Sequence, residues 1–109
     1  MTREEPSLTG QVRRMAELID YQEGSVVSRQ VMKADGGNVT LFAFDQGEGL
    51  TEHKSPFDAL VYVIDGQADV TVSGVAFHVS EGEMILMPAN APHSLKAPSR
   101  FKMLLVIVK

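Results

Sequence analysis

Two stretches decide the fold: GEGLTEHKSPFDALVYVIDG over residues 47–66 and GEMILMPANAPH over residues 82–93. Each joins glycine-marked turns to a short apolar run, at residues 59–64 in the first stretch and 84–87 in the second. Short apolar runs bounded by turn residues are typical of buried β-strands. Each stretch also carries one histidine near its apolar run. The two stretches therefore predict short buried β-strands, each with one histidine nearby.

The rest of the chain continues the β pattern. Glycine turns separate short apolar or alternating segments, and Asp65-Gly66 predicts a tight turn. Such spacing predicts an all-β sandwich or barrel. The predicted strands are residues 25–33, 38–44, 59–64, 68–72, 75–79, 84–87, 93–96 and 101–108.

The amino-terminal part is less regular. Residues 1–10 are polar and broken by Pro6 and Gly10, which predicts a short, irregular, flexible leader. Residues 11–20 carry the only helical spacing, although a short turn followed by a strand fits it as well. We expect one domain over residues 11–109, because 109 residues fit one ordinary core.

Composition narrows the class of partner. The chain has 10 basic and 14 acidic side chains, a formal charge of −4, which argues against nucleic acid and anionic membrane surfaces. It has no cysteine, so disulfides and thiolate sites are excluded. No apolar run approaches the 20 or so residues of a membrane span, and the polar start does not resemble a signal peptide. A cytoplasmic location is therefore the expectation.

Together the two stretches resemble the two motifs of the cupin superfamily. The first motif is glycine, five residues, His-x-His, three or four residues, Glu, six residues and glycine; the second is glycine, five residues, Pro-x-Gly, two residues and His. Six positions match: Gly47, His53, Gly66, Gly82, Pro88 and His93. The resemblance implies a small single-domain, antiparallel jelly-roll β-barrel, with a homodimer as its assembly. The valine-rich segment 25–33 is the candidate strand to pair across that interface.

The first motif is degenerate at its ligand positions. Metal-binding cupins use two histidines and a glutamate from the first motif with the histidine of the second. Here Ser55 and Ala59 stand at two of those four positions, so His53 and His93 are the remaining metal candidates. Asp58 is next to Ala59, but neighbouring strand residues point to opposite faces. A catalytic zinc site uses three protein ligands, so two imidazoles make an incomplete site.

Three interpretations of the His53 and His93 pair stay open. The pair holds a divalent transition metal (Zn, Ni, Fe, Mn or Cu) whose shell other groups complete, since imidazole suits several of these ions. Alternatively, it lines a metal-free pocket as hydrogen-bonding groups or a general base. In the third, it is pocket lining without catalysis. The function predicted is binding of a small molecule; the alternative is an enzyme of isomerase, dioxygenase or decarboxylase type acting on a small organic substrate.

Several apolar residues are candidates for the pocket wall, although most aromatic and methionine side chains fill cores. The pocket-lining candidates are Phe42, Phe44, Ser55, Met84 and Met103. Strand alternation places Phe77 and Val79 on one face and His78 on the other, which predicts a core pair and a surface histidine.

Overall fold

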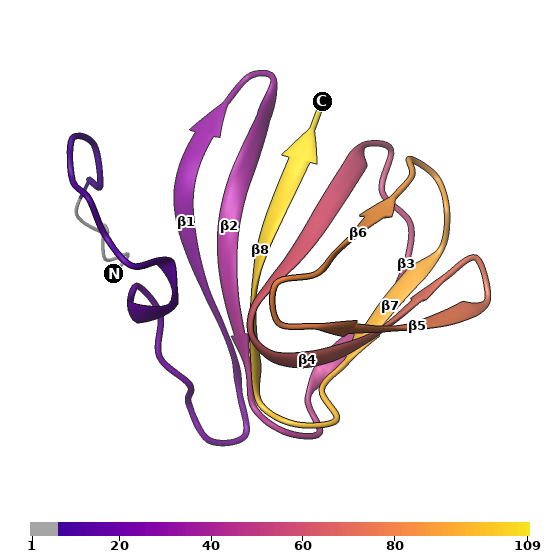
Figure 1. The fold of residues 1–109 in the computed structure, drawn as a ribbon. Coiled ribbons are helices and arrows are strands. Elements are labelled where there is room, and N and C mark those ends of the chain that lie inside the picture. Colours follow the sequence, from indigo (N-terminus) through magenta and orange to yellow (C-terminus); the bar gives the residue numbers. More distant parts are fainter. Residues whose placement is uncertain (1–6) are drawn as a thin grey trace.

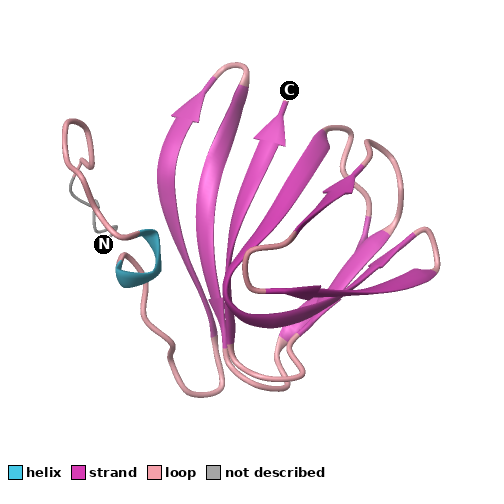
Figure 2. Ribbon diagram, in the orientation of Figure 1, coloured by secondary structure: helices cyan, strands magenta, loops and turns pink. Residues whose placement is uncertain are grey.

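The computed structural model describes residues 7–109, which form a curled antiparallel sheet preceded by an irregular segment (Figures 1 and 2). From here on, the leader means everything before β1, of which the structure describes residues 7–25. Residues 1–6 of the predicted flexible leader lie outside the described residues. The elements are η1 (Met15–Glu17), β1 (Val26–Ala34), β2 (Gly37–Phe44), β3 (Gly49–His53), β4 (Asp58–Val72), β5 (Val75–Ser80), β6 (Met84–Met87), β7 (His93–Lys96) and β8 (Phe101–Val108).

The strands make two walls that share β4. The order β1-β2-β8-β4-β7-β3 runs through the sheet, and β5 and β6 also pair with β4. The first half of β4 pairs with β6 and β8, and its second half pairs with β5 and β7. We call β1, β2, β8, β6 and the first half of β4 the large wall. The small wall is β3, β7, β5 and the second half of β4. The predicted all-β, antiparallel barrel is confirmed.

The predicted turn at Asp65-Gly66 is wrong, because β4 continues through it. Asp65 and Gly66 pair with Lys102 and Phe101 of β8, and the register shifts between Val63 and Asp65. Gly66 has φ +74°, and a Cβ there would overlap the carbonyl oxygen of Arg100. A bulge with a left-handed glycine bends a strand without ending it. The local turn signal therefore marks the point where β4 passes from the large wall to the small wall.

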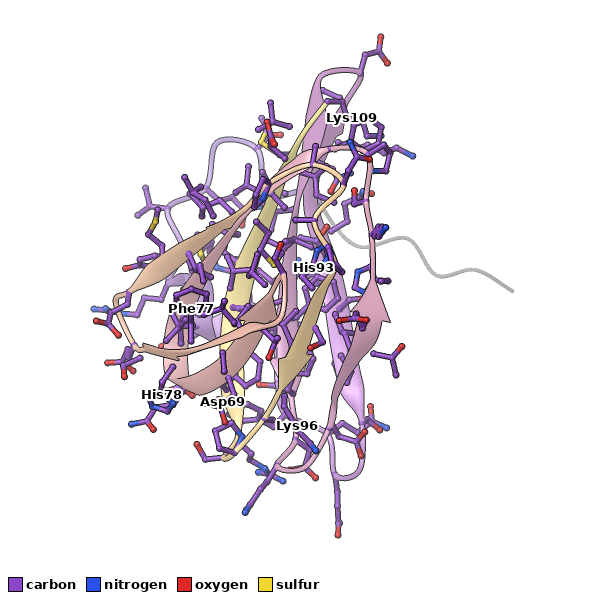
Figure 3. The ribbon with its side chains drawn as sticks, turned by 90° about the vertical axis from the view of Figure 1, so that its right-hand side faces the viewer. Asp69, Phe77, His78, His93, Lys96 and Lys109 are labelled. Atoms are coloured by element: carbon purple, nitrogen blue, oxygen red, sulfur yellow. The ribbon has the colours of Figure 1, made fainter. Side chains whose placement is uncertain are left out.

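Two other predictions differ from the structure. Residues 49–53 form β3, although two glycines and polar residues gave no strand signal there. Phe77 is 44% exposed, whereas Val79 on the same face is buried. The β4–β5 hairpin projects at one end of the barrel, and Phe77 is labelled near that end in Figure 3. His78 is exposed, as the alternation predicts.

The core lies between the two walls. Phe44 of β2 stacks on Phe101 of β8, with ring centroids 4.4 Å apart and planes 9° from parallel. Val61 and Met103 from the large wall and Val70 from the small wall are also buried there. Burial of such side chains is worth about 1.5–3 kcal/mol each. This packing fills much of the interior between the two walls.

A second apolar cluster lies on the outside of the large wall, under the leader. Ile19 is 4% exposed and packs on Leu41 and Ala43 of β2, with Leu18 and Tyr21 beside it. The leader contains η1, a single 3-10 turn, where the sequence allowed a helix. Within residues 7–109, no helix is long and apolar enough to cross a membrane.

Polar contacts fasten the leader to the barrel. The Tyr21 hydroxyl donates to Asp65 of β4, and the ring lies under the cations of Arg100, at 5.4 Å, and Lys102, at 4.9 Å. Lys102 Nζ also donates to the carbonyl of Ala16 at 2.6 Å. Burial and the Asp65 carboxylate raise the pKa of Tyr21 well above its usual value. The phenol therefore stays protonated as a donor.

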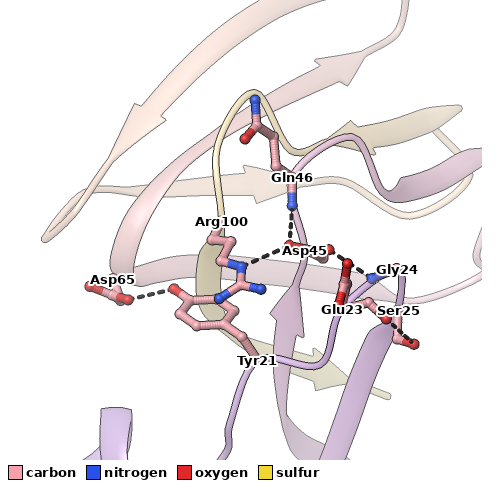
Figure 4. Close-up of polar contacts among 8 residues, drawn as sticks. All are labelled: Tyr21, Glu23, Gly24, Ser25, Asp45, Gln46, Asp65 and Arg100. Atoms are coloured by element: carbon pink, nitrogen blue, oxygen red, sulfur yellow. Dashed lines mark hydrogen bonds and ion pairs between the residues drawn. The ribbon is translucent and has the colours of Figure 1, made fainter.

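Asp45 joins the leader to two other segments (Figure 4). It accepts the backbone N–H groups of Gly24 at 2.7 Å and Gln46 at 2.9 Å, and Arg100 Nε at 2.7 Å. The Gly24 N–H and the Arg100 side chain lower the pKa of Asp45 from 3.8 to about 2. Because hydrogen bonds to the charged carboxylate favour that form, the junction depends on an ionised Asp45.

Gly66→Ala should destabilise the barrel by at least about 2 kcal/mol more than Gly74→Ala. Both glycines have positive φ, but a Cβ at Gly74 meets nothing within 4 Å, whereas one at Gly66 overlaps backbone. The comparison therefore separates the clash from the cost of a left-handed backbone. Urea unfolding measures the free energy of unfolding of both variants. Equal decreases in that free energy would contradict the explanation given for the β4 bend.

Asp45→Asn should lower the melting temperature at pH 6 but not at pH 2. A carboxyl whose pKa is lowered by folding adds stability above its unfolded value, and that stability is lost as pH falls through its folded value. The window is therefore pH 4 down to about 2. Across this pH window, thermal melts should show the difference in melting temperature between Asp45→Asn and the wild type decreasing as the pH falls. Asp35→Asn, at an exposed position in the β1–β2 turn, is the control and should leave the gap near zero throughout.

Candidate functional site

His53 and His93 meet at one end of the barrel interior. His53 is the last residue of β3, His93 is the first of β7, and the two are direct partners in the antiparallel register. Their Nε2 atoms are 3.0 Å apart, and their rings meet edge to face at 72°. His93 is 5% exposed, whereas His53 is exposed. One imidazole is therefore held inside the barrel and the other lies at its opening.

The backbone sets which ring nitrogen carries hydrogen. Nδ1 of His53 lies 2.7 Å from the carbonyl of Thr51, and Nδ1 of His93 lies 3.1 Å from the carbonyl of Ala91. A carbonyl oxygen only accepts, so each Nδ1 is the donor, and in neutral rings both Nε2 atoms carry lone pairs. Two lone pairs that face each other at 3.0 Å repel. A cation between them, either a proton or a metal ion, turns this repulsion into attraction.

A small pocket of about 70 Å³ adjoins the two imidazoles. Apart from the histidines, Ser55 supplies the polar side chain of its wall, and the other lining side chains are apolar. The lining residues are Leu50, His53, Ser55, Ala59, Met87, His93, Leu95, Met103, Leu105 and Ile107. The site thus combines a polar end, formed by His53, His93 and Ser55, with an otherwise apolar cavity.

The family model described as "Cupin domain" matches residues 40–108, which include both histidines and the whole pocket wall. The chain belongs to the cupin family. This confirms the resemblance found in the sequence motifs.

Solved structures agree with this cupin assignment. A protein of unknown function from Streptococcus pyogenes, SPY1581, is 32% identical with a TM-score of 0.90, and the match covers 100% of this chain and 96% of that one. A cupin superfamily protein from Desulfitobacterium hafniense is 25% identical, with a TM-score of 0.88 and 98% of each chain covered. A cupin 2 conserved barrel domain protein from Leptotrichia buccalis is 43% identical with a TM-score of 0.84, covering 87% of this chain and 46% of that chain. No curated protein matches the sequence.

The pocket candidates from sequence lie in three different environments. Ser55 and Met103 line the pocket. Phe44 is fully buried against Phe101, and Phe42 packs against the same core. Met84 is 47% exposed on the outside of β6.

Several wall residues were not singled out from the sequence. Leu105 and Ile107 line the pocket with Met103, and all three alternate along β8. Alternate residues of β8 share a face, which was the available sequence signal. However, residues 103–108 are all apolar, so the sequence alone did not show which face lines the pocket. Leu50 lay in a stretch expected to be a loop, which hid its role.

Of the four metal-ligand positions in the cupin motifs, only two carry a metal-binding side chain in this chain, His53 and His93. Ala59 faces the pocket, and Asp58 points to the other side, where it accepts the Ala89 N–H at 2.8 Å. Within residues 7–109, no group of three or more His, Asp or Glu could hold a metal ion. Two nitrogens each about 2.0–2.1 Å from one ion lie roughly 3.0–3.4 Å apart at common bond angles, so the observed 3.0 Å fits a shared ion. The two imidazoles fit a metal, and the remaining donors must come from elsewhere.

His78 is not part of this site. It lies on β5, exposed, with Nδ1 2.8 Å from Asp69 and Nε2 3.0 Å from Gln67. Figure 3 shows His78 apart from His93, beside Asp69 of the neighbouring strand β4. The contacts orient its ring along the surface of the small wall. His78 is therefore a matched control for experiments on the two pocket histidines.

Ala59→Glu should raise the affinity for Zn²⁺ or Ni²⁺ at least about tenfold, because it adds a carboxylate to the lining of the pocket that both imidazoles adjoin. Isothermal calorimetry with each ion measures the change. Leu60→Glu is the control, since its side chain points to the outer face and should leave the affinity unchanged. An equal effect of both variants would mean that Ala59 does not face the ion.

Proposed function

We propose that this cupin binds a small organic ligand with an anionic oxygen head group, over a divalent transition metal held by His53 and His93. The observation that carries the proposal is the facing of two Nε2 atoms at 3.0 Å while both Nδ1 atoms are engaged by backbone carbonyls. In neutral rings, that arrangement leaves the lone pairs of both rings on the two neighbouring Nε2 atoms. A cation shared by these two atoms is the simplest group to satisfy them.

The ligand supplies the donors that the described pocket wall lacks. Among residues 7–109, only Ser55 adds a further polar side chain to that wall, and a hydroxyl is a weak ligand beside imidazole. The void of about 70 Å³ compares with about 30 Å³ for one water molecule in the liquid. It therefore accepts the head of a ligand rather than a large molecule. The remainder of a larger ligand would extend past exposed His53.

An enzyme is the alternative form of this proposal. A bound divalent metal would supply Lewis-acid polarisation of a carbonyl oxygen. The chain's own residues would position the substrate: the Met103 face excludes water, and His53, at the opening, is placed to take or give a proton. Reactions of isomerase, dioxygenase or decarboxylase type are compatible with such a site. Turnover of small oxygen-rich acids by the metal-loaded protein would favour this form over binding alone.

A metal-free pocket is the second candidate function. It is favoured by the small number of metal-ligating side chains among the described pocket residues. A single proton shared between the two Nε2 atoms would also relieve their repulsion. The pair would then carry one positive charge beside apolar walls, which strengthens its attraction for a small anion. This candidate needs no third protein ligand. It predicts the same kind of head group with no metal dependence.

The proposed working unit is a homodimer, as the sequence resemblance implies. A barrel this small gains stability from covering exposed apolar strands. The β1 edge is one candidate interface, and Met32 there is 59% exposed.

Elemental analysis of untagged protein tests the metal. We expect about one transition-metal ion per chain in the wild type and in His78→Ala, and none in the His53→Ala/His93→Ala double variant. His78→Ala removes a histidine without touching the pocket. Circular dichroism should show all three proteins folded.

Equal metal content in the double variant would show that the ion binds elsewhere. Absence of metal from every sample, even after incubation with Zn²⁺ or Ni²⁺, would overturn the metal-holding form. Native mass spectrometry with oxalate or acetate would then test the metal-free form, which requires anion binding that the double variant loses.

A further inference from the structure

The large wall is apolar on both faces. Its inner face forms the core, and its outer face carries apolar side chains from β2, β4, β6 and β8. Among the described residues, the leader packs over the part of this face that carries Leu41, Ala43, Ile64 and Leu104. An antiparallel sheet normally presents one polar face to water. The uncovered part is therefore the feature that needs a partner.

The uncovered part forms one strip, which we call the outer strip. It consists of Leu60, Tyr62, Met84, Leu86, Val106 and Val108. Leu86 is 61% exposed, Val108 is 58% exposed and Met84 is 47% exposed. A groove of about 630 Å³ lies within the strip between β4, β6 and β8. Contiguous apolar surface of this kind marks an interaction site.

The segment before η1, residues 7–14, is an arm that leaves its own barrel. Among the described residues, the hydrogen bonds of residues 7–13 are all made within the segment. Val12 is fully exposed, at 102%. Figure 1 shows the arm beyond β1, on the side of the large wall away from β6. The arm therefore carries apolar surface that its own barrel does not cover.

The charges of the arm and of the outer strip are complementary. Arg13 and Arg14 follow Val12 and are exposed. Asp58 lines the groove, and Glu83 lies next to Met84 at the other end of β6. Both carboxylates are exposed, and each accepts one backbone N–H, from Ala89 and Ser80 respectively. An apolar groove with acidic ends suits a short apolar and basic segment.

We propose that the outer strip is the interface between two copies of this chain, with the arm of each copy lying on the strip of the other. The inference rests on the proposed homodimer and assigns its face. A two-fold axis uses each surface twice, so one arm and one strip per chain complete both halves. An arm of eight residues spans about 26 Å when extended, enough to cross several strands of a neighbouring wall.

Sedimentation velocity of the full chain tests the face. The wild type should sediment as two chains of 11.9 kDa at micromolar concentration. Leu86→Glu on the strip should weaken association at least about 30-fold. Met32→Glu is the matched control, since Met32 is 59% exposed on β1, at the opposite edge of the large wall. Both sites are exposed, so far-UV circular dichroism should show both variants folded like the wild type.

Cross-linking tests the arm. The chain has no cysteine, so Val12→Cys and Leu86→Cys each introduce a single thiol. When unlabelled Val12→Cys chains are mixed with ¹⁵N-labelled Leu86→Cys chains and oxidised, mass spectrometry should find the mixed disulfide. A mixture of Val12→Cys with Met32→Cys should give at least about tenfold less. The mixed species can form only between copies.

Each contrary result has its own meaning. A monomeric wild type would overturn both the homodimer and this inference. A dimer that Met32→Glu dissociates and Leu86→Glu does not would keep the homodimer but place it at the β1 edge, which overturns the outer strip. A dimer sensitive to Leu86→Glu without the Val12–Leu86 cross-link would remove the arm from the interface.

Discussion

The whole barrel depends on one bent strand. β4 pairs with β8 and β6 through its first half and with β7 and β5 through its second half. That double membership is possible because Gly66 turns the backbone where a side chain would strike the carbonyl of Arg100. Long-range pairing to β8 holds the bend in place. Without it, the two walls would be separate sheets with no interior between them.

The same bend places the site. Ala59, before the bend, lines the pocket from the large wall, while the second half of β4 pairs with β7, whose first residue is His93. β3 is held only by β7 among the described strands, and it delivers His53 to the register position opposite His93. The 3.0 Å approach of the imidazoles is thus a consequence of strand pairing. The backbone carbonyls then complete it by orienting both rings.

Much of this fold could be predicted from sequence, because strand alternation and turn residues are local signals. β6, β7 and β8 have the predicted bounds, and the two motif histidines are partners. The signals failed where long-range pairing overrides local preference. Asp65-Gly66 reads as a turn, yet β8 extends β4 through it. Met84 was a predicted pocket-lining residue but lies on the outside of β6. A four-residue edge strand with apolar residues on both faces does not indicate which face is inside.

The ligand preference of the proposed site follows from its charge. In the proposed site, neutral imidazoles would add no negative charge to a cation between them, and the rest of the pocket wall consists of Ser55 and apolar side chains. A metal ion there would keep its full charge, and a shared proton would leave one positive charge, in surroundings that screen it poorly. Uncompensated charge in such a site is costly, so either cation favours an anion beside it. The replacement of a glutamate by Ala59 therefore supports a ligand that brings the missing negative oxygen itself.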